Sequence, residues 1–231
     1  MGNYKDSTLE KLADKGNGNY AYLDNLNEAK KVLIHDRFKT LHTIAKDVKI
    51  QVEFNPTKVQ AYRLVGYENR KLNKQDFNDD TKDAGEIGAG HTVTALYEIV
   101  PHGVDVPAAA VDSLRYQKTK KKTVTAQGST SNEVLLVKIR YKEPTGKKSS
   151  KLEFILKDSD KSFAQASNDF KFASSAAGFA MALRQDKYVG EMSIQKILDT
   201  AKAAKGEDDY GIRQEFIENV ELSRQLYKNR N

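Results

Sequence analysis

The 231-residue chain contains no cysteine. Disulfide bonds, thiolate metal sites and cysteine nucleophiles are therefore excluded. This absence fits the cytosol and the periplasm equally well, so it does not fix a compartment. Histidine is also scarce, and none of the four residues lies at the spacing of an HExxH zinc motif.

Long hydrophobic runs are missing as well. No apolar run approaches the roughly 20 residues that a membrane-spanning helix needs. The first residues, GNYKDSTLEKL after Met1, lack the basic region and apolar stretch of a signal peptide. The sequence therefore predicts no membrane insertion by this segment.

The residues that are present predict a folded protein. Hydrophobic residues make up 39% of the chain and charged residues 30%, and the net charge is +6. Two basic runs, Lys118–Lys122 and Thr145–Lys151, have no interleaved aromatic side chains and no basic helix beside them. We therefore expect no nucleic-acid partner and interpret both runs as solvated loop tips.

Residues 1–45 have the pattern helix, strand, helix. Ser7 with Glu10, and later Asn25 with Glu28, have the spacing of a capping box at a helix start. Between the two helices, Asn19–Leu23 has the pattern of a short strand. A lone strand flanked by helices is typical of a parallel α/β sheet, so we expect its neighbouring strands upstream of residue 1.

Residues 46–158 change to the two-residue period of β-strands. In Asp47–Phe54 the apolar residues alternate with polar ones, which predicts that Val48, Ile50, Val52 and Phe54 face inward. Further strands are expected at Lys58–Tyr67, Thr92–Val100, Leu114–Gln117, Glu133–Lys142 and Ser150–Lys157. Strands joined by turns in this way indicate an antiparallel β-sandwich-like domain.

Residues 159–231 return to the helical period. The first helix has an apolar pattern at Phe170, Ala173, Ala177, Ala180, Met181 and Leu183. Ser193 caps a second helix, and a third runs from about Asp208 to Tyr227. The predicted fold class is α+β, with an α/β remnant, a β-sandwich-like domain and a helical C-terminal region packed on it.

The stretch QDFNDDTKDAGEIGAGH, from Gln75 to His91, concentrates the residues that carry chemistry. Asp76, Asn78 and Asp80 have the spacing of EF-hand ligands, but Thr81 stands where that loop needs glycine, and Ile87 stands at its twelfth position. Its glycines match neither nucleotide-binding fingerprint, and a strand follows them instead of a helix. We therefore assign no catalytic, cofactor-binding or metal residue, and keep the loop as an interaction surface formed by Asp76, Asp79, Asp80, Asp83, Glu86 and His91.

Long stretches of the chain carry a resemblance to a known family. DVKIQVEFNPTKVQAYRLVGYENRKLNKQDFNDDTKDAGEIGAGHTVTALYE resembles the C-terminal module of bacterial von Willebrand factor type A domain proteins of the YfbK type. The leader GNYKDSTLEKLADKGNGNYAYLDNLNEAKKVL is similar to the last helix-strand-helix of their type A domain. FKFASSAAGFAMALR and AKAAKGEDDYGIRQEFIENVE resemble the helical end of that module, so the match covers essentially the whole chain.

The resemblance implies a non-catalytic protein of the periplasm or cell envelope. Its expected function is to support a type A domain in protein–protein adhesion, assembly or scaffolding. The resemblance implies a protein partner but identifies neither that partner nor the oligomeric state. Type A domains bind a divalent ion through D-x-S-x-S, and DSDKS (Asp158–Ser162) has aspartate where the first serine belongs. We expect that ion upstream of residue 1 and no cofactor in this chain. The alternative is a divalent-ion-dependent or hydrolase-like site around the Asp76–His91 loop.

Overall fold

The computed structural model describes residues 5–16, 18–67, 71–104, 132–190 and 192–228. The chain divides into two compact units. The sheet unit holds residues 1–63, 67–93 and 97–158, and the helical unit consists mainly of residues 159–231. The strand predicted at Leu114–Gln117 lies outside the described residues.

The sheet unit begins with short helices. These are α1 (Asp6–Lys15), α2 (Leu26–Lys30), the π-helical turn η1 (Lys31–His35) and α3 (Arg37–Leu41). Asn25 caps α2 as predicted, because its side-chain oxygen accepts the N–H of Glu28 at 2.9 Å. The strand predicted at Asn19–Leu23 is wrong, since this segment has no regular secondary structure. A strand needs a neighbour to complete its ladder, and no described strand pairs with this segment.

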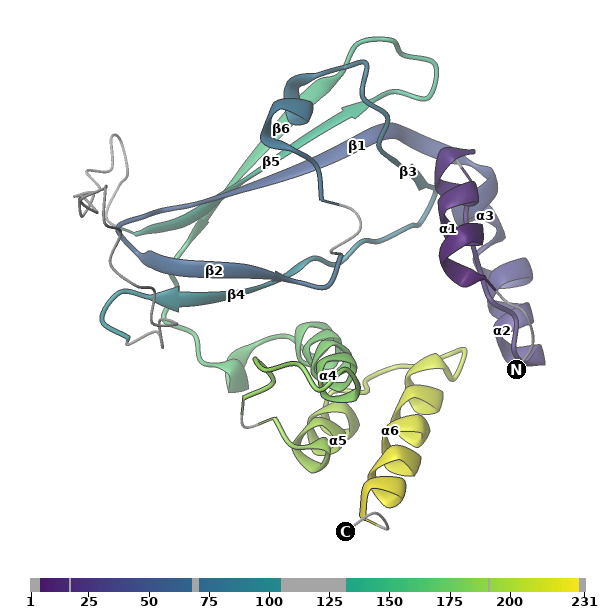
Figure 1. The fold of residues 1–231 in the computed structure, drawn as a ribbon, viewed down its shortest axis with the longest axis vertical. Helices are drawn as coiled ribbons and strands as arrows, with labels where there is room; N and C mark the ends of the chain where they lie inside the picture. The colour runs from purple at the N-terminus through teal and green to yellow at the C-terminus, as the bar shows by residue number, and fades with distance from the viewer. Residues whose placement is uncertain (1–4, 17, 68–70, 105–131, 191, 229–231) are drawn as a thin grey trace, which may run out of the picture. The chain divides into compact units, whose positions relative to one another are not determined.

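Four antiparallel strands form the main sheet, in the order β3 (Gly85–Gly88), β1 (Thr43–Phe54), β5 (Glu133–Lys142) and β6 (Ser150–Lys157). Two further strands, β2 (Val59–Val65) and β4 (Leu96–Pro101), form a second sheet (Figure 1). Phe54 at the end of β1 stacks on Tyr62 of β2, with ring centroids 4.2 Å apart, and meets Tyr97 of β4 edge-on at 5.4 Å. The α+β fold class is confirmed.

The sequence interpretation missed β3, which lies inside the acidic stretch. It pairs with the first half of β1, and the end of α3 packs against it. A Cβ atom added at Gly88 would lie 1.7 Å from the carbonyl oxygen of Lys39. Gly88 is therefore needed for the close approach of two backbones, and only Gly90 of the three glycines has a positive φ, at 76°.

The side chains of β1 that are buried do not all lie on the face that the alternation predicts. Phe54 is buried, as the alternation predicts. In the middle of the strand, however, Lys49 is 3% exposed and Ile50 is 45% exposed, so the prediction that Ile50 faces inward is wrong. The polar face is covered there by the loop that follows the 3-10 turn η3 (Lys74–Asn78), whose Phe77 is buried.

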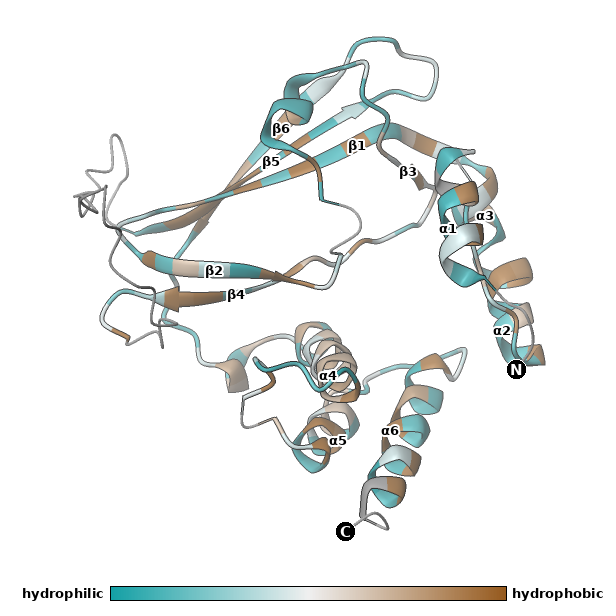
Figure 2. Cartoon of the chain, viewed as in Figure 1, coloured by the Kyte–Doolittle hydropathy of each residue, from teal (hydrophilic) through white to brown (hydrophobic). Residues whose placement is uncertain are grey.

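The helical unit contains α4 (Asn168–Leu183), α5 (Ile194–Ala203) and α6 (Ile212–Lys228). Its core consists of Ile197, Leu198, Ala201, Ile217 and Val220, and Figure 2 shows the hydrophobic residues along α5 and α6. Ser193 caps α5 as predicted, because its side chain accepts the N–H of Lys196 at 3.2 Å. None of the described helices is both long enough and apolar enough to cross a bilayer.

The predicted apolar face of α4 is wrong at several positions. Phe170, Ala180 and Leu183 are exposed, whereas Ser175 and Gly178 are buried. Small residues occupy this buried face because a neighbouring segment comes close: a Cβ at Gly178 would lie 2.7 Å from the sulfur of Met192. Close packing at this part of α4 therefore depends on the missing side chain of Gly178.

Candidate functional site

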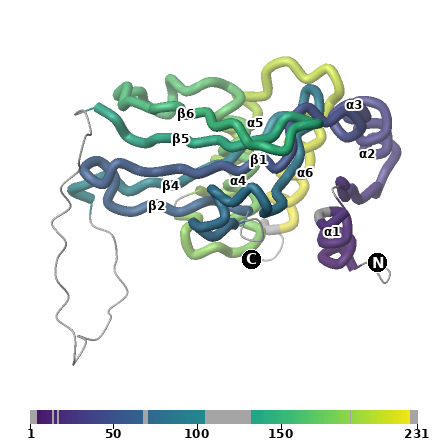
Figure 3. The backbone as a smooth tube through the Cα atoms, turned by 90° about the horizontal axis from the view of Figure 1, so that it is seen from above, coloured from purple at the N-terminus to yellow at the C-terminus, as the bar shows by residue number. Residues whose placement is uncertain are grey.

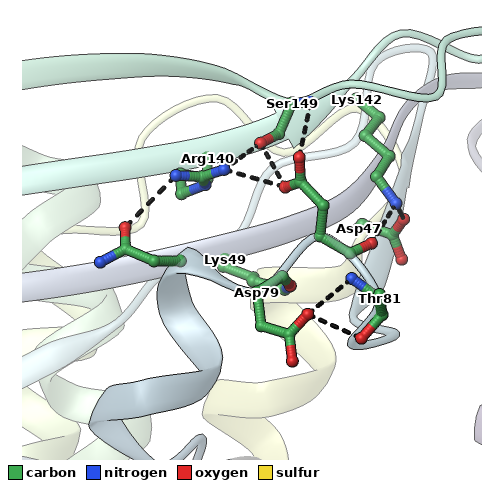
Figure 4. Close-up of polar contacts among 9 residues, drawn as sticks. Asp47, Lys49, Asp79, Thr81, Arg140, Lys142 and Ser149 are labelled. Atoms are coloured by element: carbon green, nitrogen blue, oxygen red, sulfur yellow. Dashed lines mark hydrogen bonds and ion pairs between the residues drawn. The ribbon is translucent and has the colours of Figure 1, made fainter.

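The acidic stretch lies across the polar face of β1 and β5, where it meets three basic side chains. Lys49 comes from β1, and Arg140 and Lys142 come from β5. Figure 4 shows these cations among the acidic side chains and backbone of the loop. Two strands and a loop that are distant in sequence therefore build one polar cluster, which we call the loop–sheet cluster.

Asp80 makes the densest set of contacts in this cluster. One carboxylate oxygen accepts Nη2 of Arg140 at 2.9 Å and the hydroxyl of Ser149 at 2.5 Å. The other accepts the backbone N–H of Ser149 at 3.4 Å. The Ser149 hydroxyl and the Arg140 guanidinium lower the pKa of Asp80 to about 2, from an ordinary value of 3.8.

Asp47 and Lys142 form the most enclosed ion pair. The carboxylate accepts Nζ of Lys142 at 2.6 Å, and the two side chains are 17% and 13% exposed. Burial raises the pKa of Asp47, but the bonds from Lys142 and from the N–H of Ala84 outweigh burial and hold it below its usual range. The same bond to Asp47 raises the pKa of Lys142.

The backbone at Asp47 adopts a left-handed conformation, with φ of 50°. The register of β1 against β5 shifts between Lys46 and Lys49, which marks a β-bulge at this position. Bulges redirect side chains and occur near functional sites as well as at strand irregularities. Here the bulge aims Asp47 at the loop, since its second contact is the Ala84 N–H at 3.2 Å.

Lys49 ties the loop backbone to the sheet. Its Nζ donates to the carbonyl oxygen of Asp79 at 2.5 Å. The Asp79 carboxylate turns back on its own loop, accepting the N–H and the hydroxyl of Thr81 at 2.8 and 2.6 Å. These bonds lower the pKa of Asp79. A turn aspartate commonly bonds the backbone of its own loop in this way.

The other predicted loop residues are dispersed. Asp76 accepts the Asn73 amide at 3.2 Å, and Glu86 on β3 accepts the Thr43 hydroxyl at 3.4 Å. Asp83 lies close enough to Asp47 and Lys142 to influence the pKa of both. His91 is exposed at the end of the turn after Gly88, and its backbone N–H donates to the Gly88 carbonyl at 3.0 Å. The structure thus gathers Asp79, Asp80 and Asp83 with the cations, and leaves Asp76, Glu86 and His91 apart.

The chemistry of the loop–sheet cluster is that of charge neutralisation. Its carboxylates face ammonium and guanidinium groups at hydrogen-bonding distance. Within the described ranges, no group of three or more histidine, aspartate or glutamate side chains is placed to hold a metal ion. Arg140 and Lys142 are therefore the partners that a cation would have to displace from Asp80 and Asp47.

The sequence interpretation missed five residues of this cluster: Asp47, Lys49, Arg140, Lys142 and Ser149. The signal was present in the alternation, because Lys138, Arg140 and Lys142 all lie on one face of β5. Three cations on one face of a strand need a counter-charge if that face is covered. The acidic loop of the same chain could supply this counter-charge. The sequence does not predict, however, which loop residue lies beside which strand residue.

Comparison with known proteins gives two matches. The family model described as "Uncharacterized protein YfbK, C-terminal" matches residues 39–226. "Uncharacterized protein YfbK" of Escherichia coli (strain K12) is 42% identical over 221 residues, which cover 96% of this chain and 37% of that relative. The chain thus spans just over a third of the relative's length, and no solved structure was found to match it. Because the family model covers most of the chain, from within α3 to within the last turn of α6, the chain belongs to the YfbK family.

Proposed function

We propose that the chain is a non-catalytic structural and interaction module that supports a von Willebrand type A domain. In this proposal it acts in protein–protein adhesion, assembly or scaffolding in the bacterial envelope. The sequence resemblance of residues 1–45 to the end of a type A domain motivates the proposal. The observation that carries it is an apolar surface on the N-terminal helices.

This surface consists of six residues, which we call the N-terminal apolar surface: Leu12, Leu26, Leu33, Ile34, Phe38 and Leu41. All are more than half exposed, and Leu41 is 81% exposed. Figure 2 shows hydrophobic residues along α2 and α3. Single exposed apolar residues are ordinary, but six of them on the consecutive short helices of residues 6–41 offer apolar area that another protein could cover.

The loop–sheet cluster supports an interaction module over the ion-dependent or hydrolase-like alternative. The carboxylates of Asp47 and Asp80 are already bound to Lys142 and Arg140. A general base or a metal ligand at these positions would first have to lose its ion pair. The cluster instead fixes the loop to the sheet, which suits a rigid support.

The direct test is binding between this chain and a separately produced type A domain of a YfbK protein, measured by calorimetry. We expect Leu33→Asp and Phe38→Asp to weaken binding at least about tenfold, which corresponds to about 1.4 kcal/mol. Leu222→Asp is the matched control, because Leu222 is 55% exposed and lies in the helical unit, against 64% for Leu33 and 59% for Phe38. Absence of binding, or equal weakening by the control, contradicts the proposal.

A calcium titration distinguishes the proposed module from the alternative, an ion-dependent site around the Asp76–His91 loop. A ligand that binds only the native state raises the melting temperature with its concentration, by a stabilisation of about 2.7 kcal/mol at one hundred times its Kd. The proposed module predicts an unchanged melting temperature at millimolar calcium. A rise that Asp80→Asn abolishes would favour the ion-dependent site.

A further inference from the structure

Strand β6 forms one margin of the four-stranded sheet. It pairs with β5 along its length, and among the described strands it has no other neighbour. Figure 3 shows β6 beside β5, with β1 on the far side of β5. All eight residues of β6 are exposed. The outer margin of such a strand presents N–H and C=O groups that are available to another strand.

The side chains of β6 add an apolar stripe to this margin. Leu152, Phe154 and Leu156 alternate along the strand, so they lie on one face of the sheet, and each is 44–55% exposed. Among the features that commonly protect an edge strand, β6 has charged side chains, at Lys151, Glu153 and Lys157. Ser150–Lys157 contains no proline, and its one register shift against β5 lies at the end, next to Lys157.

The sequence of β6 is nearly the same in both directions. Lys151–Lys157 reads KLEFILK, with Phe154 at the centre, leucine two positions away on each side and lysine at each end. Antiparallel pairing of two identical strands about Phe154 places Leu152 opposite Leu156 of the second copy. Phe154 then meets Phe154 of the second copy, so every residue of the apolar stripe faces an apolar residue.

The charged face tolerates the same register. Lys151 comes opposite Lys157 of the second copy, but Glu153 already binds Lys151, with Nζ and Oε1 2.7 Å apart. Glu153 also lies diagonal to Lys157 of the second copy, within reach of its long side chain. A register centred on Glu153 would instead place two glutamates opposite each other. In this register Glu153 faces Ile155 of the second copy, so the Phe154-centred register combines full strand overlap with no opposed pair of carboxylates.

We propose that two copies of the chain associate through antiparallel β6–β6 pairing about a two-fold axis at Phe154. The two four-stranded sheets then become one continuous sheet. We choose a second copy as the occupant because KLEFILK is nearly the same in both directions. An identical antiparallel strand therefore places apolar residues opposite apolar residues. Such an interface is isologous, with the same patch used by both copies. It is separate from the N-terminal apolar surface and goes beyond the proposed function.

The absence of cysteine makes a cross-linking test specific. Opposite residues of an antiparallel pair have Cα atoms about 4.5–5.5 Å apart, within the range of a disulfide. In the Phe154→Cys chain the two introduced thiols meet at the two-fold axis. In the Lys157→Cys chain they lie about 20 Å apart, since six residues at about 3.3 Å each separate them. Both replaced side chains are exposed, so the fold is expected to remain.

We expect mild oxidation to dimerise the Phe154→Cys chain at least about tenfold faster than the Lys157→Cys chain. A mixture of Lys151→Cys and Lys157→Cys chains, which keeps Phe154, is expected to form the mixed dimer faster than either forms its own. Sedimentation of the unmodified chain is expected to show a monomer–dimer equilibrium. Equal cross-linking at Phe154 and Lys157, or a monomer at every protein concentration, would overturn the proposal.

Discussion

At the level of single residues, the polar face of β1 and β5 can be covered because the acidic loop neutralises its cationic side chains. Lys49 is almost fully buried, and the adjoining Lys142 is mostly so. Buried cations are costly unless hydrogen-bonded and neutralised. The Asp79 carbonyl, the Asp47 carboxylate and the Asp80 carbonyl supply those partners. The position of the acidic loop on the sheet therefore depends on a few ionised side chains.

Asp80 makes this dependence measurable by pH. Its folded-state pKa of about 2 lies below the ordinary 3.8, so ionisation favours the folded state. The stabilisation is fully present above about pH 5 and is lost as the pH falls toward 2. We expect the difference in unfolding free energy between the unmodified chain and Asp80→Asn, from urea titrations, to shrink over this range. A difference between Asp80→Asn and the unmodified chain that stays flat over this pH range would contradict the assignment.

At the scale of elements, a short strand and a short helix define the N-terminal edge of the sheet. The helix α3 lies so close to β3 that the backbone of Lys39, in the middle of α3, occupies the place of a side chain at Gly88. The loop–sheet cluster then holds the opposite end of the acidic stretch on β5 through Asp80. The stretch is thus anchored at both ends, once by steric fit and once by charge.

The steric anchor predicts a pair of unequal glycine substitutions. We expect Gly88→Ala to lower the unfolding free energy by about 1–3 kcal/mol, because its Cβ would overlap a backbone oxygen that cannot rotate away. Gly85→Ala is the matched control on the same strand, since a Cβ there meets nothing within 4 Å. Urea titration measures both. Similar losses for the two variants would show that strand propensity, and not the contact with Lys39, dominates.

At the scale of the whole molecule, the chain holds two compact units with separate cores. In the sheet unit the buried apolar residues are few, and include Phe54, Val59 and Phe77. In the helical unit Ile197, Leu198 and Val220 are almost completely buried. The packing of residues 159–231 on the sheet, which the sequence suggests, stays a prediction, as do the boundaries near residues 45 and 158.

Hydrogen exchange on a core variant addresses the independence of the units. Leu198→Ala removes a fully buried side chain, and we expect it to cost the helical unit about 2–5 kcal/mol. Protection is expected to fall in α4, α5 and α6 and to remain in β1 and β5, because each unit has its own core. Leu222→Ala, at an exposed position of α6, is the control. Equal loss of protection in β1 and β5 would show that the two units unfold together.

Elements with a strong periodicity were predictable from the amino-acid sequence. Alternation located β1, β5 and β6, the helical period located α4 to α6, and Asn25 and Ser193 cap the helices they were expected to cap. These features depend on neighbouring residues alone. The resemblance to the YfbK family also came from the sequence, and the match over residues 39–226 agrees with it, whereas the link to a type A domain stays a prediction.

Which faces of the elements are covered depends on contacts between distant segments, and the sequence pattern does not predict it. Alternation divides a strand into two faces, but it cannot say that an acidic loop neutralises Lys49 and leaves Ile50 exposed. It also cannot foresee β3, because a four-residue strand containing two glycines is specified by its contacts with β1 and α3. In each case, burial and strand pairing depend on the contact between two segments. The free energy of that contact cannot be predicted from the sequence of either segment alone.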